Sequence, residues 1–205
     1  MALILPTSVR GFHDYFKLTA IPEELVVAFG YHFDAKTLAL PLAQEPLPWL
    51  AELSVRLDFA FRHVGMSSET PRREFLIAPI LGEAARHVDA QVRSELDVRV
   101  NTQLKGALDY LLQAQGNLLV VEAKQADLTR GFSQLCAELI AVDQWTDSTI
   151  DILYGAVSVG DIWRFGTLER GAKRITQDQD IFSVPTDTER LMRTLIAILR
   201  GETAA

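Results

Sequence analysis

The fold of this chain is decided by the stretch GALDYLLQAQGNLLVVEAK, which covers residues 106–124. Its two ends are mainly apolar runs of the length of a β-strand, and Gln115 and Gly116 between them suit a tight turn. With these two residues in the loop, Ala114 pairs with Asn117, and this pair sets the register of an antiparallel hairpin. We therefore predict strands over residues 106–113 and 117–124.

The hairpin register brings charged residues together. Counting outward from the turn places Asp109 directly opposite Glu122, with their Cβ atoms ~5 Å apart on one face. Lys124 lies two residues beyond Glu122, so it projects from that same face. The apolar run over 118–121 is typical of a buried strand. Three ionisable groups are thus expected to converge on one side of two apolar strands.

Periodicity and turn residues define the elements on both sides of the hairpin. The predicted helices cover residues 23–30, 49–64, 70–87 and 128–145, and a last one opens near residue 186; further strands are predicted over 37–40, 95–100, 150–159 and 161–168, with an edge strand over 174–180. The helix over 70–87 is expected to be capped by Thr70 and kinked at Pro79.

The order of these elements predicts the fold class. A three-stranded meander, a crossover helix and further strands indicate an α/β fold with a central mixed sheet flanked by helices. Residues 1–66 hold five of the eight prolines. They are predicted to form an N-terminal extension packed on a core domain of residues 67–205.

Composition limits the classes of function. With 205 residues, 48% of them hydrophobic and 23% charged, the chain can form one globular domain with a real core. Its net charge of −7 argues against a protein that coats nucleic acid by bulk charge. A local basic patch combined with a metal ion remains compatible with this charge, because the metal supplies the positive charge at the centre.

The cysteine content and the N-terminus bear on the compartment. Cys136 is the single cysteine, which allows no internal disulfide and no cysteine metal site, and indicates a reducing cytoplasm. The start of the chain lacks a basic region and a cleavage site, so we expect no signal peptide. No apolar stretch approaches the ~18 residues of a membrane helix, and no membrane partner is expected.

Two adjacent carboxylates need a reason to be buried. Their mutual repulsion and their desolvation both disfavour the charged forms. A divalent cation removes this cost, and Mg²⁺, with Mn²⁺ as a substitute, prefers such oxygen ligands. Lys124 would then orient an attacking water or stabilise charge on a phosphate, which predicts phosphodiester hydrolysis. The alternative is a structural ion pair between Lys124 and Asp109 or Glu122.

The residues Asp109 and Glu122-Ala123-Lys124 resemble the motif of the PD-(D/E)XK nuclease superfamily, which has the restriction-endonuclease-like fold. Residues 72–81, RREFLIAPIL, resemble the first helix of that family. Residues 131–135, GFSQL, resemble the glutamine-bearing helix of its RecB-like and type I restriction subunit branches. The resemblance spans about residues 70–164. Two positions depart from it: Leu108 replaces the usual proline, and Glu138 stands where a tyrosine often follows.

The resemblance implies roles for individual residues. Asp109 and Glu122 would be metal ligands, with the backbone carbonyl of Ala123 as a third, and Lys124 would be catalytic. Two further site residues are expected from the helices: Glu74, with Glu69 as its rival, and Gln134. The alternatives are that Glu74 is a first-turn acid favoured by the helix dipole and that Gln134 is a surface glutamine.

The predicted function is therefore Mg²⁺-dependent cleavage of nucleic acid, with DNA rather than RNA as the expected partner. The family resemblance is also compatible with a homodimer or with accessory subunits. The second hypothesis is a catalytically silent module of the same fold that binds nucleic acid or a protein. Trp163 is expected to pack under the sheet, with base stacking as the alternative. Arginines such as Arg73 and Arg130 either line a phosphate groove or are scattered surface charges.

Overall fold

One mixed sheet of eight strands organises the computed structural model, which describes residues 9, 11–18, 21–124 and 127–203. The strands are β1 (His32–Lys36), β2 (Gln91–Arg99), β3 (Lys105–Ala114), β4 (Asn117–Ala123), β5 (Ile152–Ser158), β6 (Ile162–Glu169), β7 (Arg174–Asp178) and β8 (Phe182–Ser183). The helices are α1 (Phe12–Lys17), α2 (Pro22–Ala28), α3 (Leu50–His63), α4 (Glu69–Arg72), the π-helical turn η1 (Arg73–Ile77), α5 (Ala78–Val88), α6 (Leu128–Trp145) and α7 (Thr188–Arg200).

The order of strands in the sheet is β1-β7-β6-β5-β4-β3-β2, and β8 pairs with one end of β6. Strands β2, β3 and β4 form an antiparallel meander, α6 follows, and β5 lies parallel to β4. A parallel neighbour requires a crossover connection, and α6 provides it. The predicted α/β class, with its meander, crossover helix and further strands, is confirmed.

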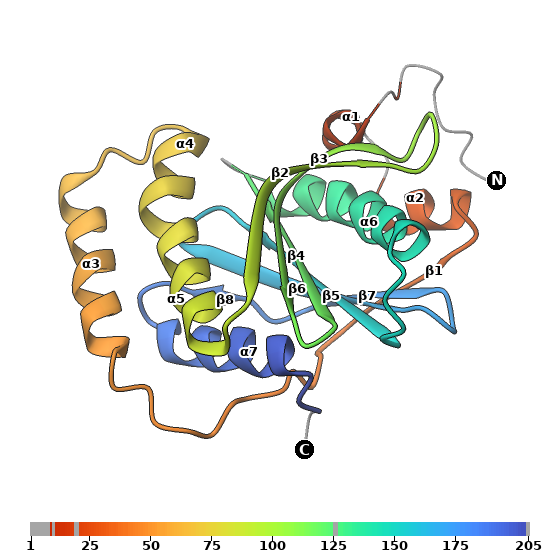
Figure 1. The fold of residues 1–205 in the computed structure, drawn as a ribbon. Coiled ribbons are helices and arrows are strands. Elements are labelled where there is room, and N and C mark those ends of the chain that lie inside the picture. The colour runs from red at the N-terminus through yellow and green to blue at the C-terminus, as the bar shows by residue number, and fades with distance from the viewer. Residues whose placement is uncertain (1–8, 10, 19–20, 125–126, 204–205) are drawn as a thin grey trace.

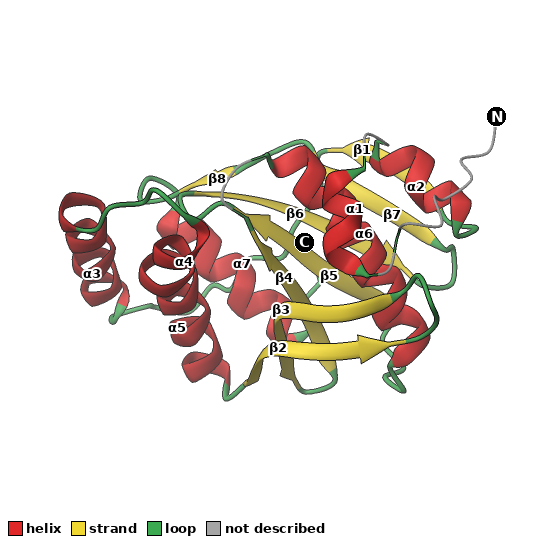
Figure 2. Ribbon diagram, turned by 90° about the horizontal axis from the view of Figure 1, so that it is seen from above, coloured by secondary structure: helices red, strands yellow, loops and turns green. Residues whose placement is uncertain are grey.

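Helices cover both faces of the sheet (Figures 1 and 2). Helices α1, α2 and α6 lie on one face, and α5 and α7 lie on the other, with α3 outside them. Alternate side chains of strand β4 point to opposite faces of the sheet. Leu118 and Val120 belong to the core under α6. Leu119 and Val121 belong to the core under α5 and α7. Glu122 and Lys124 continue the first of these two sets, toward α6.

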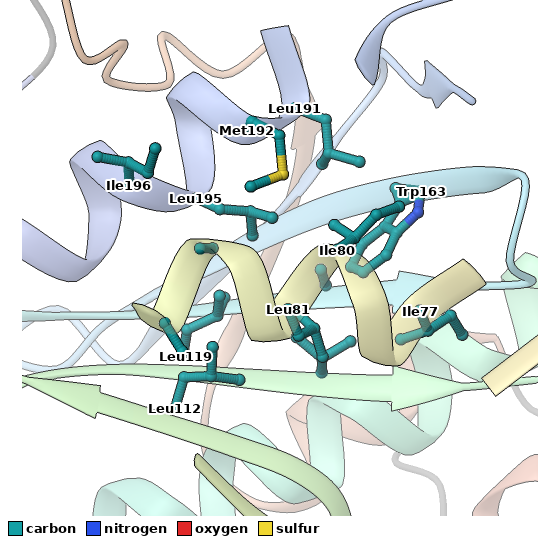
Figure 3. Packing of buried hydrophobic residues seen from close by; sticks show 14 of the residues in the cluster. Ile77, Ile80, Leu81, Leu112, Leu119, Trp163, Leu191, Met192, Leu195 and Ile196 are labelled. Carbon is teal, nitrogen blue, oxygen red and sulfur yellow. The ribbon is translucent and has the colours of Figure 1, made fainter. Parts of the chain in front are cut away.

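The core under α5 and α7 contains Trp163, shown among its neighbours in Figure 3. Its side chain is fully buried, and its indole Nε1 donates a hydrogen bond to the carbonyl of Gly160 at 3.2 Å. A buried tryptophan normally finds such a partner for its one polar group. The predicted packing of Trp163 in the core is confirmed.

Two predictions at the sheet edge are wrong. No strand covers residues 37–40, because the amide of Leu38 donates to the Asp178 carboxylate at 3.0 Å instead of to a neighbouring strand. The strand in this region is β1, which ends just before residue 37. Its residues show no clear alternation of buried and exposed side chains. Because β1 pairs in parallel with β7, β7 is not the edge strand. The N-terminal segment of residues 1–66 thus contributes a strand to the sheet.

The helix predicted over residues 70–87 is also irregular at its start. It begins at Glu69, with Ser68 rather than Thr70 at the N-cap position. Near the kink predicted at Pro79, the structure shows a π-helical turn over Arg73–Ile77, directly before α5, and Pro79 lies in the first turn of α5. Pro79 has no N–H to donate to the preceding turn. The wider π turn changes which side chains face the sheet.

Close packing of α6 on the sheet predicts a specific sensitivity at Gly166. A Cβ there would lie 2.6 Å from Cζ of Phe132 and 3.1 Å from the carbonyl oxygen of Thr176. We expect Gly166→Ala to lower the free energy of unfolding by about 1–3 kcal/mol, measured by urea denaturation. The control is Gly171→Ala, where a Cβ meets nothing within 4 Å. Equal effects of the two substitutions would contradict this packing.

Candidate active site

The hairpin has the predicted register. Ala114 pairs with Asn117, and the ladder continues to Tyr110 opposite Val121. The next step places Asp109 opposite Glu122. Here the pairing changes, because Oδ2 of Asp109 accepts a hydrogen bond from the backbone amide of Ala123 at 2.8 Å. The side chain of Asp109 is therefore fixed to the end of β4.

Glu122 is the most constrained of the acids at this site. Its side chain is 1% exposed and forms a short ion pair with Nζ of Lys124. Its Oε1 also accepts a hydrogen bond from Nε2 of Gln134 at 2.7 Å. Its other oxygen, Oε2, is buried and has no hydrogen-bond partner among the described residues. Glu122 thus keeps one buried oxygen without a partner in this geometry, and its carboxyl group also lies within hydrogen-bonding reach of the Glu138 carboxyl group.

The electrostatics of Glu122 follow from this burial. Desolvation is the main cause that raises its pKa, and the negative charges of Glu138 and Asp109 raise it further. The positive charge of Lys124 acts in the opposite direction without cancelling the rise. Glu122 therefore binds a proton more readily than a solvent-exposed glutamate does. A divalent cation at the free oxygen would reverse this, because metal ligands bind in the deprotonated form.

Lys124 is held from three sides. Its backbone amide donates to the carbonyl of Ser158 at 2.8 Å, which extends the pairing of β4 with β5. Gly131 of α6 lies so close that a Cβ there would be 3.2 Å from Cγ of Lys124. Its Nζ lies 5.4 Å from the centre of the Phe16 ring. Burial lowers the pKa of Lys124, but the pairing with Glu122 outweighs it and the pKa is raised, so the lysine is an ammonium ion.

Helix α6 supplies a second buried acid that the sequence analysis did not place in the site. Nε2 of Gln134 donates to Glu122 and also to Oε1 of Glu138, at 2.9 Å. Glu138 is fully buried, and this desolvation is the main cause that raises its pKa to about 7. The signal in the sequence was a polar pair four residues apart on an otherwise apolar helix. Gln134 is therefore a buried residue of the site and not a surface glutamine.

Arg73 joins the site from the π-helical turn. Its guanidinium contacts Oε1 of Glu95 at 2.6 Å and Oδ1 of Asp109 at 3.6 Å, and it lies over the Tyr110 ring at 5.4 Å. Glu95 stands opposite Asp109 on β2 with a positive φ of 53°, a conformation uncommon outside glycine. Arg72 serves the fold instead: it donates to the carbonyl of Val159 at 2.7 Å.

The structure places the two candidate helix acids differently. Glu74 is exposed and does not line the cavity at the site, whereas Glu69 lines it. The prediction for Glu74 assumed α-helical spacing to Ile77 and Leu81. The π turn lies between them, and its extra residue per turn changes the direction of Glu74. Glu69 precedes this turn and faces the cavity together with Arg73.

These groups share one cavity of about 830 Å³. Asp109, Glu122, Lys124 and Gln134 all line it. Helix α1 and the residue before it add a wall that the sequence analysis missed: Gly11, Phe12, His13, Asp14 and Phe16. The sequence hinted at this helix only through the close spacing of its aromatic residues 12, 15 and 16. The helix of six residues is too short for a convincing periodicity.

The charge of the cavity favours cations. Its lining includes the six acids Asp14, Glu69, Glu95, Asp109, Glu122 and Asp127, and the three bases Arg73, Lys124 and Arg130. An anionic ligand would be repelled unless cations accompany it. The acids outnumber the bases even though the ion pairs described above neutralise some of them.

The donor set suits a hard cation with few protein ligands. No group of three histidine, cysteine, aspartate or glutamate side chains in the described part of the chain is arranged to hold a metal ion. Mg²⁺ usually takes one or two carboxylates, and water and substrate oxygens complete its shell. The buried, unpaired oxygen of Glu122, with Asp109 on the next strand, fits that pattern.

Comparison of the chain with protein-family models, with curated proteins and with solved structures found no match. Within the described residues, no helix combines the length and the apolar character needed to cross a bilayer.

The raised pKa of Glu138 predicts a pH-dependent stability. The folded state keeps a proton between pH 4.5 and about 7 that the unfolded state has lost, so stability falls as pH rises through this window. Glu138→Gln removes this proton exchange. We expect the unfolding free energy of the variant, relative to the wild type, to increase by up to about 3 kcal/mol from pH 4.5 to 7.5.

Urea denaturation across this pH range measures the difference. The control is Glu52→Gln on the exposed face of α3, which should follow the wild type at each pH. A Glu138→Gln curve that stays parallel to the wild-type curve would show that Glu138 is not the residue that retains the proton.

Proposed function

We propose that this chain is a Mg²⁺-dependent nuclease with a restriction-endonuclease-like core of the PD-(D/E)XK type, which acts on DNA rather than RNA. The observation that carries the proposal is the Glu122 carboxylate, held between Lys124 and Gln134 with one oxygen unpaired, and with Asp109 one strand away. This arrangement combines two hard oxygen ligands with a buried cationic side chain. Metal-dependent phosphodiester hydrolysis can use both kinds of group.

The residues have separable roles in this proposal. Asp109 and Glu122 would hold the metal, with the Ala123 carbonyl as a third ligand. A bound Mg²⁺ would supply charge stabilisation at the phosphate. Gln134 fixes the Glu122 carboxylate through the 2.7 Å hydrogen bond. Because pairing keeps Lys124 protonated, it is suited to stabilise negative charge on the phosphate and not to abstract a proton.

Three parts of the proposal extend beyond the site. Arg73, which lines the cavity, is a second cation that can contact phosphate. We also propose a cytoplasmic location, because the single cysteine, Cys136, is buried as a free thiol. A homodimer or accessory subunits would contribute to target recognition.

One observation favours the second candidate function, a catalytically silent module that binds nucleic acid or a protein partner. Glu122 is already paired with Lys124, and Asp109 with Arg73 and the Ala123 amide. Such a closed set of contacts neutralises both acids without a metal ion. The two candidates differ in their need for a divalent cation, so measurements of cleavage and of metal binding separate them.

The nuclease proposal predicts the loss of cleavage in two variants. Labelled linear, plasmid and single-stranded DNA is incubated with the protein and Mg²⁺ or Mn²⁺, and cleavage is followed on gels. Lys124→Ala and Asp109→Asn should each lower the rate at least about 100-fold, because each removes a charged group of the proposed centre. The matched controls are Lys36→Ala on β1 and Asp58→Asn on α3, whose side chains are exposed. Equal rates in all five proteins would indicate a contaminating nuclease.

Metal binding is tested without activity. A cation that binds only the folded state stabilises it, by about 2.7 kcal/mol at 100 times its Kd. We expect Mn²⁺ to raise the Tm of the wild type but not that of Asp109→Asn. Because Glu122 must lose its proton to bind the metal, the rise should grow as the pH increases. A wild-type Tm that does not respond to Mg²⁺ or Mn²⁺ would favour the silent module.

A further inference from the structure

Helix α1 faces the proposed catalytic centre across the cavity. The helix follows Gly11, and its residues Phe12, His13, Asp14 and Phe16 line the same cavity as Asp109, Glu122 and Lys124. Nζ of Lys124 lies over the Phe16 ring, 5.4 Å from its centre. An aromatic ring beside a phosphate-binding lysine is placed where the base next to that phosphate would lie.

This wall is firmly attached to the core. Phe12 and Tyr15 are buried in the cluster under α6, and the Tyr15 hydroxyl donates to the carbonyl of Gln103 at 3.2 Å. Gly106 lies directly against the helix, since a Cβ there would be 3.0 Å from Cδ2 of Phe12. A substrate that needed α1 to move would have to expose both buried rings. The cavity is therefore bounded by α1 when the substrate binds.

The size of the bounded cavity limits the substrate. A volume of about 830 Å³ falls in the range of small-ligand sites, about 300–1,000 Å³. This is room for a few nucleotides of one strand; a duplex could approach only with most of its turn outside the cavity. The acid-rich lining also lacks the broad basic surface that usually grips duplex phosphates. A base can stack on an aromatic ring such as Phe16 only when it is not paired with a second strand, which favours a single strand over a duplex.

We infer that this cavity takes a single nucleic acid strand, or the unpaired end of a duplex, with a base packed against Phe16 and the neighbouring phosphate at Lys124. The inference rests on the proposed nuclease function for its choice of ligand. It adds to that proposal the class of substrate, which is a single strand, and the residue that selects it, which is Phe16. Phe16 is thus a binding residue, and its removal should weaken the binding of single strands more than it slows the chemical step.

Binding and cleavage are measured with one labelled oligonucleotide, as a single strand, as a blunt duplex and as a duplex with an unpaired end. Fluorescence anisotropy in Ca²⁺, which takes oxygen ligands as Mg²⁺ does, gives the affinities. Cleavage in Mg²⁺ gives kcat and KM. We expect the single strand and the unpaired end to bind at least about 10-fold tighter than the blunt duplex.

Variants of Phe16 test the role of the ring. Phe16→Leu keeps an apolar side chain without the ring and should weaken single-strand binding roughly 5- to 100-fold, with the larger change in KM and not in kcat. Phe16→Tyr keeps the ring and should bind like the wild type. The matched control is Phe59→Leu on α3, where the side chain is 57% exposed and lies outside the cavity.

The outcomes separate this inference from the proposed function. If the blunt duplex is cut and bound as well as the single strand, or if Phe16→Leu binds like the wild type, the inference is wrong and the nuclease proposal stands. If single strands bind with dependence on Phe16 but no substrate is cut, the nuclease proposal is wrong and the cavity is a single-strand binding site. If no nucleic acid binds or is cut, both are wrong.

Discussion

Glu122 is an acid buried in the middle of a sheet, and the arrangement of its surroundings follows from that burial. A carboxylate without solvent needs partners, and Lys124 and Gln134 supply them from β4 and α6. Gly131 lets α6 approach closely enough for these contacts, since a Cβ there would be 2.7 Å from Cγ1 of Val157. The spacing of helix and sheet is thus tied to the site.

The buried network around Glu122 also holds an excess of acidic side chains. Glu138 lies behind Gln134 as a second buried acid, so the network contains more acids than nearby bases can neutralise. Buried polar groups left partly unsatisfied are costly, and their persistence is a reason to expect a function for them. A cation is the simplest partner for such a network. Arg73 and Lys124 fill part of that role through their ion pairs with Asp109 and Glu122.

The N-terminal segment contributes more than a covering. Strand β1 forms one edge of the sheet. Helix α1, which carries Phe16, forms a wall of the cavity next to Lys124. These two elements lie on either side of α2 in the sequence. Helix α1 packs against α6 on one face of the sheet, whereas β1 is a strand of the sheet itself, next to β7 (Figure 2). The size of the cavity and the class of ligand that it can hold therefore depend on residues far from the acid and lysine motif.

The sequence by itself determined the hairpin, the crossover helix and the convergence of Asp109, Glu122 and Lys124. These follow from local rules, because a two-residue turn sets a register and alternation sets a face. Tertiary structure alone decided that Glu69 and not Glu74 faces the cavity, since a π turn changes helical phase. It also decided that Glu138 is buried beside Gln134 and that α1 lies across from Lys124. Such contacts join segments distant in sequence, and their positions depend on how the whole core packs.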